Sequence, residues 1–140
     1  MKRLLMTALG ACLPLAACAN QPAEGPPLKD TYWKLVELRG QPVVKGPRDS
    51  YMVLKDGGQV QGNGGCNGMG GTYTLKAPDR LSFGPMVSTQ MACVDGMETE
   101  TGFHAVLQQV DSYVIGDDGR LQLLKARMAP LAVLEAVALP

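Results

Sequence analysis

The chain has 140 residues, with 13 lysines and arginines balanced by 13 aspartates and glutamates, and its formal net charge at pH 7 is zero. A nucleic-acid-binding protein needs a clustered basic surface, which this charge balance does not suggest, so we expect no nucleic-acid partner. The length suits a single domain with a hydrophobic core of its own.

The N-terminus has the layout of a secretory signal peptide, which we place at residues 1–17. Lys2 and Arg3 form a basic start. The apolar run over residues 4–15 is too short to span a bilayer, because a membrane helix needs about 20 residues. The sequence therefore predicts export rather than a membrane-spanning anchor.

The end of this segment, Leu15-Ala16-Ala17-Cys18, resembles the bacterial lipobox. In a lipobox the cysteine thiol is acylated with diacylglycerol and the chain is cut just before it. The resemblance implies that Cys18 anchors the mature protein to a membrane through lipid, and Ala19 in place of an aspartate favours the outer membrane, facing the periplasm. The alternative is an ordinary signal peptide in which Cys18 has no role.

Residues 18–30 join Cys18 to a proline-rich stretch without apolar periodicity, which predicts an extended tether. A proline-rich segment extends by about 3.1 Å per residue, so the tether would reach about 30 Å. We therefore expect the folded domain over residues 31–140, held just off the membrane.

Alternating apolar residues and turn signals predict an antiparallel sheet. Trp33 and Leu35 share one side of the first expected strand. Asp56-Gly57-Gly58 separates two apolar runs and signals a hairpin, because these residues accept positive φ. The expected strands are residues 31–38, 51–55, 59 onward, 72–76, 81–83, 113–116, 120–126 and 129–137.

One helix is expected within residues 95–113. Its first turn carries Glu98 and Glu100, which complement the helix dipole, whereas Gly102 weakens it by up to about 1 kcal/mol relative to alanine. Together the elements predict a small single α+β domain, a strongly curved antiparallel sheet or open barrel of about eight strands with one helix packed on it. The residues at helical spacing are Phe103, Val106, Leu107 and Val110.

Two of the four cysteines remain for the folded domain. Cys12 leaves with the signal peptide and Cys18 is used by the lipid, so Cys66 and Cys93 are left. An exported protein meets an oxidising environment, so we expect these two to form a disulfide. By the chain-entropy estimate such a loop closure contributes about 3 to 4 kcal/mol.

The stretch Gly62-Asn63-Gly64-Gly65-Cys66-Asn67 looks at first like a phosphate-binding loop. It lacks the third glycine of the dinucleotide fingerprint and the lysine of a Walker loop, and a strand-like segment follows where a helix should begin. Glycine also permits positive φ and close backbone approach, and Asn67 can hydrogen-bond local backbone. We interpret the stretch as a sharp bend that leaves Cys66 facing inward.

Three kinds of reactive site are alternatives to this architectural interpretation. A thiolate enzyme would need Cys66 or Cys93 beside His104, the only histidine, which we expect at the surface or its boundary. No spacing supports a set made of Ser88, His104 and Asp95. Sulfur ligands suit Cu(I), but the methionines fall in different predicted elements, and core filling is the simpler interpretation of Met86, Met91 and Met97. We expect no catalytic residue, metal or cofactor.

Three sequence blocks resemble the META domain family of HslJ-like envelope lipoproteins. The blocks are GNGGCNGMGGTY (62–73), STQMAC (88–93) and METETGFHAVL (97–107), and Ser88 stands where a second threonine is common. The resemblance implies a curved antiparallel sheet around a helix, with no established catalytic residues, and some members are associated with heat stress or antibiotic tolerance. The motif residues are Gly62, Gly64, Gly65, Cys66, Asn67, Tyr73, Thr89, Ala92, Cys93, Met97, Glu100 and Phe103.

The leading hypothesis is a non-enzymatic, lipid-anchored envelope protein that acts by binding a partner protein or another envelope component, in envelope or stress-related processes. The alternative is a binding module for a small hydrophobic ligand in the mouth of the curved sheet, because small barrels can hold one such molecule. An enzyme is the third hypothesis.

Overall fold

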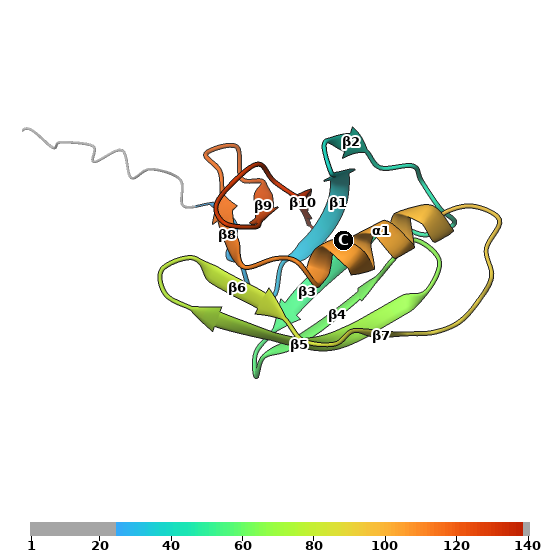
Figure 1. The fold of residues 1–140 in the computed structure, drawn as a ribbon, viewed down its shortest axis with the longest axis horizontal. Coiled ribbons are helices and arrows are strands. Elements are labelled where there is room, and N and C mark those ends of the chain that lie inside the picture. The colour runs from blue at the N-terminus through green and yellow to red at the C-terminus, as the bar shows by residue number, and fades with distance from the viewer. Residues whose placement is uncertain (1–24, 139–140) are drawn as a thin grey trace, which may run out of the picture.

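The computed structural model describes residues 25–138, which form ten strands and one helix (Figure 1). Eight strands follow one another in the order β6-β5-β4-β3-β1-β10-β9-β8, while β2 pairs with β1 and β7 pairs with β5. Every pairing between the strands is antiparallel. The elements are β1 (Tyr32–Leu38), β2 (Gln41–Pro42), β3 (Tyr51–Lys55), β4 (Gln59–Asn63), β5 (Gly68–Lys76), β6 (Arg80–Phe83), β7 (Val87–Ser88), α1 (Met97–Leu107), β8 (Ser112–Ile115), β9 (Leu121–Leu124) and β10 (Ala132–Val137).

The two outer strands of this order, β6 and β8, approach each other and nearly close the sheet into a barrel. The amide of Leu81 donates to the carbonyl of Asp111 at 3.3 Å, and the amide of Tyr113 donates to the carbonyl of Asp79 at 3.0 Å. We call this junction, with the side chains of residues 79–80, 111–112 and 126–127, the seam.

The predicted α+β fold, a strongly curved antiparallel sheet with one helix packed on it, is confirmed.

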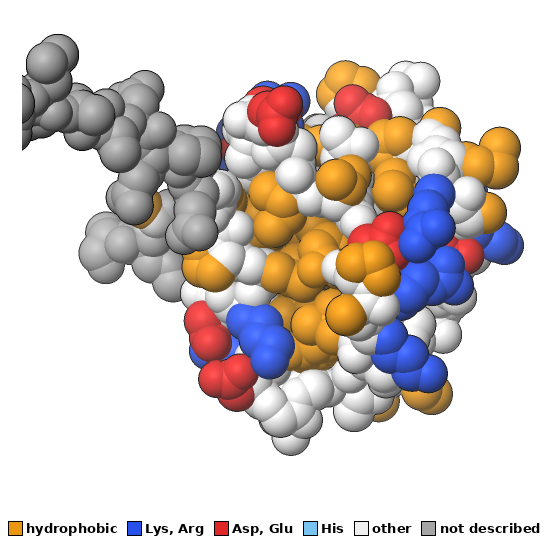
Figure 2. Space-filling model, turned by 90° about the vertical axis from the view of Figure 1, so that its left-hand side faces the viewer, with side chains coloured by type: hydrophobic (Ala, Val, Ile, Leu, Met, Phe, Trp, Pro, Cys, Tyr) orange, Lys and Arg blue, Asp and Glu red, His pale blue; other side chains and the backbone are white. Residues whose placement is uncertain are grey.

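Charged side chains line the seam, with exposed arginines beside half-buried aspartates. The guanidinium of Arg127 donates two hydrogen bonds to Asp79, at 2.8 and 2.9 Å, and these hold the pKa of Asp79 below its usual value. The carboxylate of Asp111 accepts from the Ser112 hydroxyl and from the Ala126 amide, and these bonds lower its pKa. Figure 2 views the end of the molecule that holds the seam and shows hydrophobic side chains in the middle of the face, with charged groups around them.

The core lies between the concave side of the sheet and α1 (Figure 1). Trp33 and Leu35 lie on one side of β1, as predicted, and this side faces the core, with exposed fractions of 0% and 2%. Phe103, Val106 and Leu107 bring the apolar stripe of the helix into the same cluster. Full burial of one such side chain is worth about 1.5 to 3 kcal/mol, so this stripe holds the helix in place.

The predicted helix is confirmed but ends earlier than its apolar spacing suggests. It ends at Leu107, and Val110 is buried just after the turn that follows. Gly102 sits inside the helix, where the side chain of Leu38 from β1 packs against it. A β-carbon at position 102 would lie 2.7 Å from Cδ2 of Leu38, so any larger residue there would require the Leu38 side chain to shift.

The last residues assigned to the tether contact the domain. Lys29 forms a parallel bridge with Leu54, the amide of Asp30 donates to the carbonyl of Leu54, and Leu28 packs against the core. The expected signal peptide and Cys18 lie outside the described residues. Within residues 25–138, no helix is long and apolar enough to cross a membrane.

Candidate functional site

The glycine-rich stretch is the turn of a hairpin. Asn63 at the end of β4 pairs with Gly68 at the start of β5, and residues 64–67 connect them. We call these four residues the glycine loop. The amide of Gly64 donates to the carbonyl of Asn67 at 2.9 Å, and the amide of Gly65 donates to Oδ1 of Asn63 at 2.8 Å. A strand follows the loop, as predicted, where a phosphate-binding loop would lead into a helix.

Three glycines from distant segments meet at this loop. Gly65 has φ of +122°, a conformation that favours glycine. A β-carbon on Gly46 would lie 2.6 Å from the carbonyl oxygen of Gly65, and one on Gly96 would lie 2.9 Å from Cα of Gly46. Bare backbone therefore brings the segment before β3, the glycine loop and the start of α1 together.

Glu100 reaches from the first turn of α1 into the glycine loop, and only 6% of it is exposed. Its Oε2 accepts from the amide of Asn67 at 2.6 Å and from the amide of Cys66 at 3.2 Å. Its Oε1 accepts from Nδ2 of Asn67 at 2.8 Å. A buried carboxylate is costly unless such bonds satisfy it, so Glu100 joins helix to loop in addition to complementing the helix dipole.

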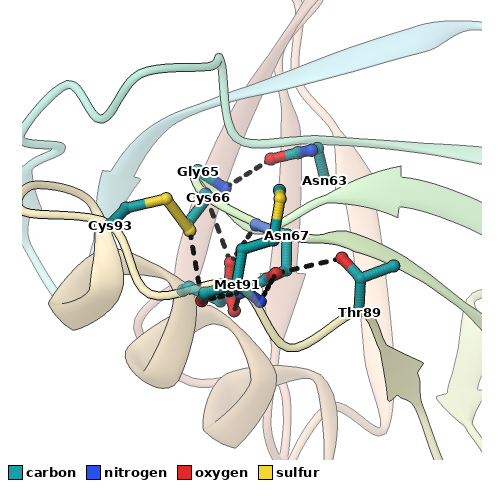
Figure 3. Close-up of a disulfide and its surroundings, with 8 residues drawn as sticks. Asn63, Gly65, Cys66, Asn67, Thr89, Met91 and Cys93 are labelled. Carbon is teal, nitrogen blue, oxygen red and sulfur yellow. Dashed lines mark hydrogen bonds between the residues drawn. A yellow bond between two sulfur atoms is a disulfide. The ribbon is translucent and has the colours of Figure 1, made fainter.

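The carboxamide of Asn67 is the centre of this network (Figure 3). Its Oδ1 accepts from the amide of Met91 at 2.7 Å and from the hydroxyl of Thr89 at 3.0 Å. Its Nδ2 donates to the carbonyl of Met91 at 3.1 Å and to Glu100. The sequence predicted local backbone partners for Asn67, but these partners are 22 to 33 residues away, so the side chain connects three parts of the chain.

Asn67 also extends a strand ladder. Val87 of β7 pairs with Gly70, and the amide of Thr89 donates to the carbonyl of Gly68 at 3.0 Å. Two residues further on, the amide and carbonyl of Met91 bond to the Asn67 carboxamide as they would to a peptide group. We call residues 87–92 the braced segment. Its backbone is hydrogen-bonded to β5 and to the Asn67 carboxamide, whereas all six of its side chains are exposed.

A disulfide fixes the end of the braced segment. Cys66 and Cys93 are joined, with their Cα atoms 6.0 Å apart, which confirms the predicted pairing (Figure 3). Cys66 is 1% exposed and so faces inward as expected, whereas Cys93 is half-buried. The bond ties the chain that leads into α1 to the glycine loop.

The structure gathers most motif residues around this network. Tyr73 and Phe103 lie apart from it: the Tyr73 hydroxyl donates to the carbonyl of Lys55 at 2.7 Å, and Phe103 is a fully buried core residue. Sequence reasoning missed the contact between Glu100 and Asn67. A signal existed, because Glu100 precedes Phe103 by three residues and Leu107 by seven and so continues the buried stripe of the helix.

The three residues of the possible Ser/His/Asp set lie apart. Ser88, His104 and Asp95 line three different surface hollows. His104 is half-buried, as expected for a boundary residue, and its Nε2 has no hydrogen-bond partner among the residues described. Within the same residues, no group of three or more His, Cys, Asp or Glu side chains is placed to hold a metal ion.

The three candidate sulfur ligands also have different surroundings. Met86 packs against the core, which agrees with core filling. Met91 and Met97 are 49% and 38% exposed, so the core-filling interpretation does not hold for them. Both belong to the surface formed by the braced segment and the start of α1.

A hollow of about 650 Å³ lies between the β1–β2 region and the first turns of α1, and its lining includes Val94, two residues beyond the braced segment. We call it the groove. Val44 and Val94 on its lining are 71% and 102% exposed, so apolar surface faces solvent here. The charged residues of its lining are Arg39, Asp95 and Glu98.

Comparisons with known proteins agree on the fold. An NMR structure of a protein from Burkholderia xenovorans is 22% identical with a TM-score of 0.62, over 99% of this chain and 100% of that chain. Another NMR structure is 17% identical with a TM-score of 0.60, over 77% of this chain and 90% of that chain. No curated protein matches the chain. The family model described as META domain matches residues 26–138, and the chain therefore belongs to the META domain family.

Proposed function

We propose that this chain is a lipid-anchored envelope protein, held through Cys18 in the outer membrane and facing the periplasm, whose META domain binds a partner protein and performs no catalysis. One observation carries the proposal: the buried carboxamide of Asn67 and the disulfide fix the backbone of the braced segment, although the side chains of this segment are exposed. A surface that is already ordered loses little conformational entropy on binding, which favours a docking role.

The arrangement of the domain suits this role. Gly25, the first described residue, lies against Ile115 at the end of β8, since a β-carbon on it would be 3.4 Å from Cγ2 of Ile115. The loop that carries the braced segment lies at the other end of the molecule (Figure 1). An anchor at Cys18 would therefore join the domain at the end opposite the braced segment.

Photo-crosslinking in cells tests the proposal. A photoreactive amino acid at Gln90, in the braced segment, should give discrete crosslinked proteins in the membrane fraction. The matched control is the same probe at Val114, which is 43% exposed on β8 at the other end of the domain and should give none of these bands. Cys18→Ser should release the protein from the membrane fraction. Identical patterns from both positions, or no protein crosslinks at Gln90, would refute partner binding at this surface.

A small hydrophobic ligand remains the second candidate, because the groove supports it. Its volume of about 650 Å³ lies within the range of roughly 300 to 1,000 Å³ typical of ligand sites. Inside the barrel, Trp33 and Phe103 fill the space, so the groove is a better location than the mouth of the sheet. Native mass spectrometry of the delipidated domain tests this candidate: a retained small-molecule mass supports it, and loss of that mass in Val44→Asp assigns it to the groove.

A further inference from the structure

The backbone of the braced segment alternates in direction. Val87, Thr89 and Met91 direct their amide or carbonyl groups inward, to Gly70, Gly68 and the Asn67 carboxamide. In an extended chain the groups of the intervening residues point to the opposite side. The amides and carbonyls of Ser88, Gln90 and Ala92 therefore face outward.

This outward side is an unpaired strand edge. Among the residues described, neither Gln90 nor Ala92 has a hydrogen-bond partner. Natural proteins usually blunt such edges with charges, prolines or bulges, because an open edge pairs with other chains. Residues 87–94 read VSTQMACV, with no charged residue and no proline, so nothing in this run blocks pairing.

The edge leads directly into the groove. Val94, Asp95 and Met97, which follow the braced segment, form part of the groove lining. A chain paired along Gln90 and Ala92 would therefore continue over this apolar hollow. The carboxylates of Asp95 and Glu98 outnumber the guanidinium of Arg39 there, which favours a positively charged group beside the apolar one.

We propose that an extended segment of a partner protein adds to the braced segment as a further β-strand, placing an apolar side chain followed by a basic one in the groove. This inference rests on the proposed partner-binding function and adds its mode. Main-chain hydrogen bonds would give affinity and the groove would give specificity, as in other cases of strand addition.

A second copy of this chain fits the edge less well. In antiparallel pairing about Gln90, Met86 of the second copy would lie opposite Val94. Met86 already packs against its own core, so it cannot fill the groove. The geometry therefore favours a different protein, and self-association becomes an outcome that the test can reveal.

A phage-displayed library of random heptapeptides provides the probe. Panning against the oxidised domain should enrich peptides with alternating apolar residues and a lysine or arginine. Gln90→Pro removes one outward amide without breaking an internal bond and should weaken binding of an enriched peptide about tenfold, the effect of about one lost hydrogen bond. Gln90→Ala keeps the amide and should bind normally. Val44→Ser in the groove should weaken binding, whereas its control Val114→Ser should not.

Hydrogen exchange gives a readout that does not depend on the folding of the proline variant. In the free domain the Met91 amide should already exchange slowly, because Asn67 accepts its proton, while the Gln90 and Ala92 amides exchange fast. The peptide should slow the Gln90 and Ala92 amides selectively. No enrichment, no protection at these two amides, or self-association in place of peptide binding would overturn strand addition. If crosslinking at Gln90 still captures a partner, the proposed function survives and only its mode is wrong.

Discussion

The two ends of this small barrel are stabilised by different kinds of interaction, one exposed to water and the other buried. At the seam, β6 and β8 are joined by two backbone hydrogen bonds and by side chains that remain in contact with water, such as Asp79 and Arg127. At the glycine loop, a disulfide and a carboxamide with 2% exposure hold three segments together. Exposed ion pairs add little to the free energy of unfolding. A buried hydrogen-bond network in which every polar group has a partner, in contrast, makes the structure rigid and selects one packing arrangement. The rigid end is also the end that presents the braced segment.

Removing the disulfide should have the largest effect on this contrast. The double substitution Cys66→Ala/Cys93→Ala opens a loop with a sequence separation of 27, which should lower the free energy of unfolding by about 3.5 kcal/mol. Urea titration of the oxidised wild type, the reduced wild type and the double variant measures this. The two forms without the bond should agree, and an unchanged midpoint would mean that the network alone holds this end.

Asn67→Ala should come next. It leaves the Met91 amide and carbonyl without their partner and removes the Nδ2 donor from Oε1 of Glu100, so the free energy of unfolding should fall by roughly 3 kcal/mol. Asn63→Ala is the matched control, since that carboxamide accepts one bond, from Gly65, and its loss should cost about 1 kcal/mol. Equal effects of the two substitutions would contradict the central role of Asn67.

The seam should give the smallest effect, and it should depend on pH. The pKa of Asp79 is lowered in the folded protein by its hydrogen bonds from Arg127, so folding favours the charged carboxylate. Its stabilising contribution is therefore present above the ordinary value of 3.8 and is lost as the pH falls through the lower pKa of the folded state.

Comparison of Asp79→Asn with the wild type tests the seam. The urea midpoint of the variant should be slightly lower at pH 6, and the difference should vanish as the pH falls well below 3.8. Asp117→Asn changes a carboxylate in the turn between β8 and β9 and serves as the control. A difference that persists in acid would show that Asp79 acts through packing and not through its charge.

Much of the fold follows from local patterns in the sequence. The alternation around Trp33 and Leu35 and the helical spacing of Phe103 and Leu107 identify the buried faces, because burial repeats every second residue in a strand and every third or fourth in a helix. The start of β5 was missed, since Gly68, Gly70 and Gly71 have no side chains to show an alternation.

The candidate site was less predictable for a physical reason. The cysteine pair follows from the number of thiols and the expected compartment. The braced segment, in contrast, owes its order to the side chain of Asn67, which lies 24 residues before Met91 in the chain. Local periodicity carries no information about such a contact, so the sequence pattern of the braced segment indicates only a loop.

The meeting of Gly46, Gly65 and Gly96 limits how this protein can change. Most tight contacts tolerate mutation because a larger residue on one side can be offset by a smaller one on the other. Here all three participants are already as small as an amino acid can be, so no second substitution can make room for the first. In a mutational screen of the domain, we therefore expect these three positions to tolerate the fewest substitutions and to have the fewest second-site changes that restore folding.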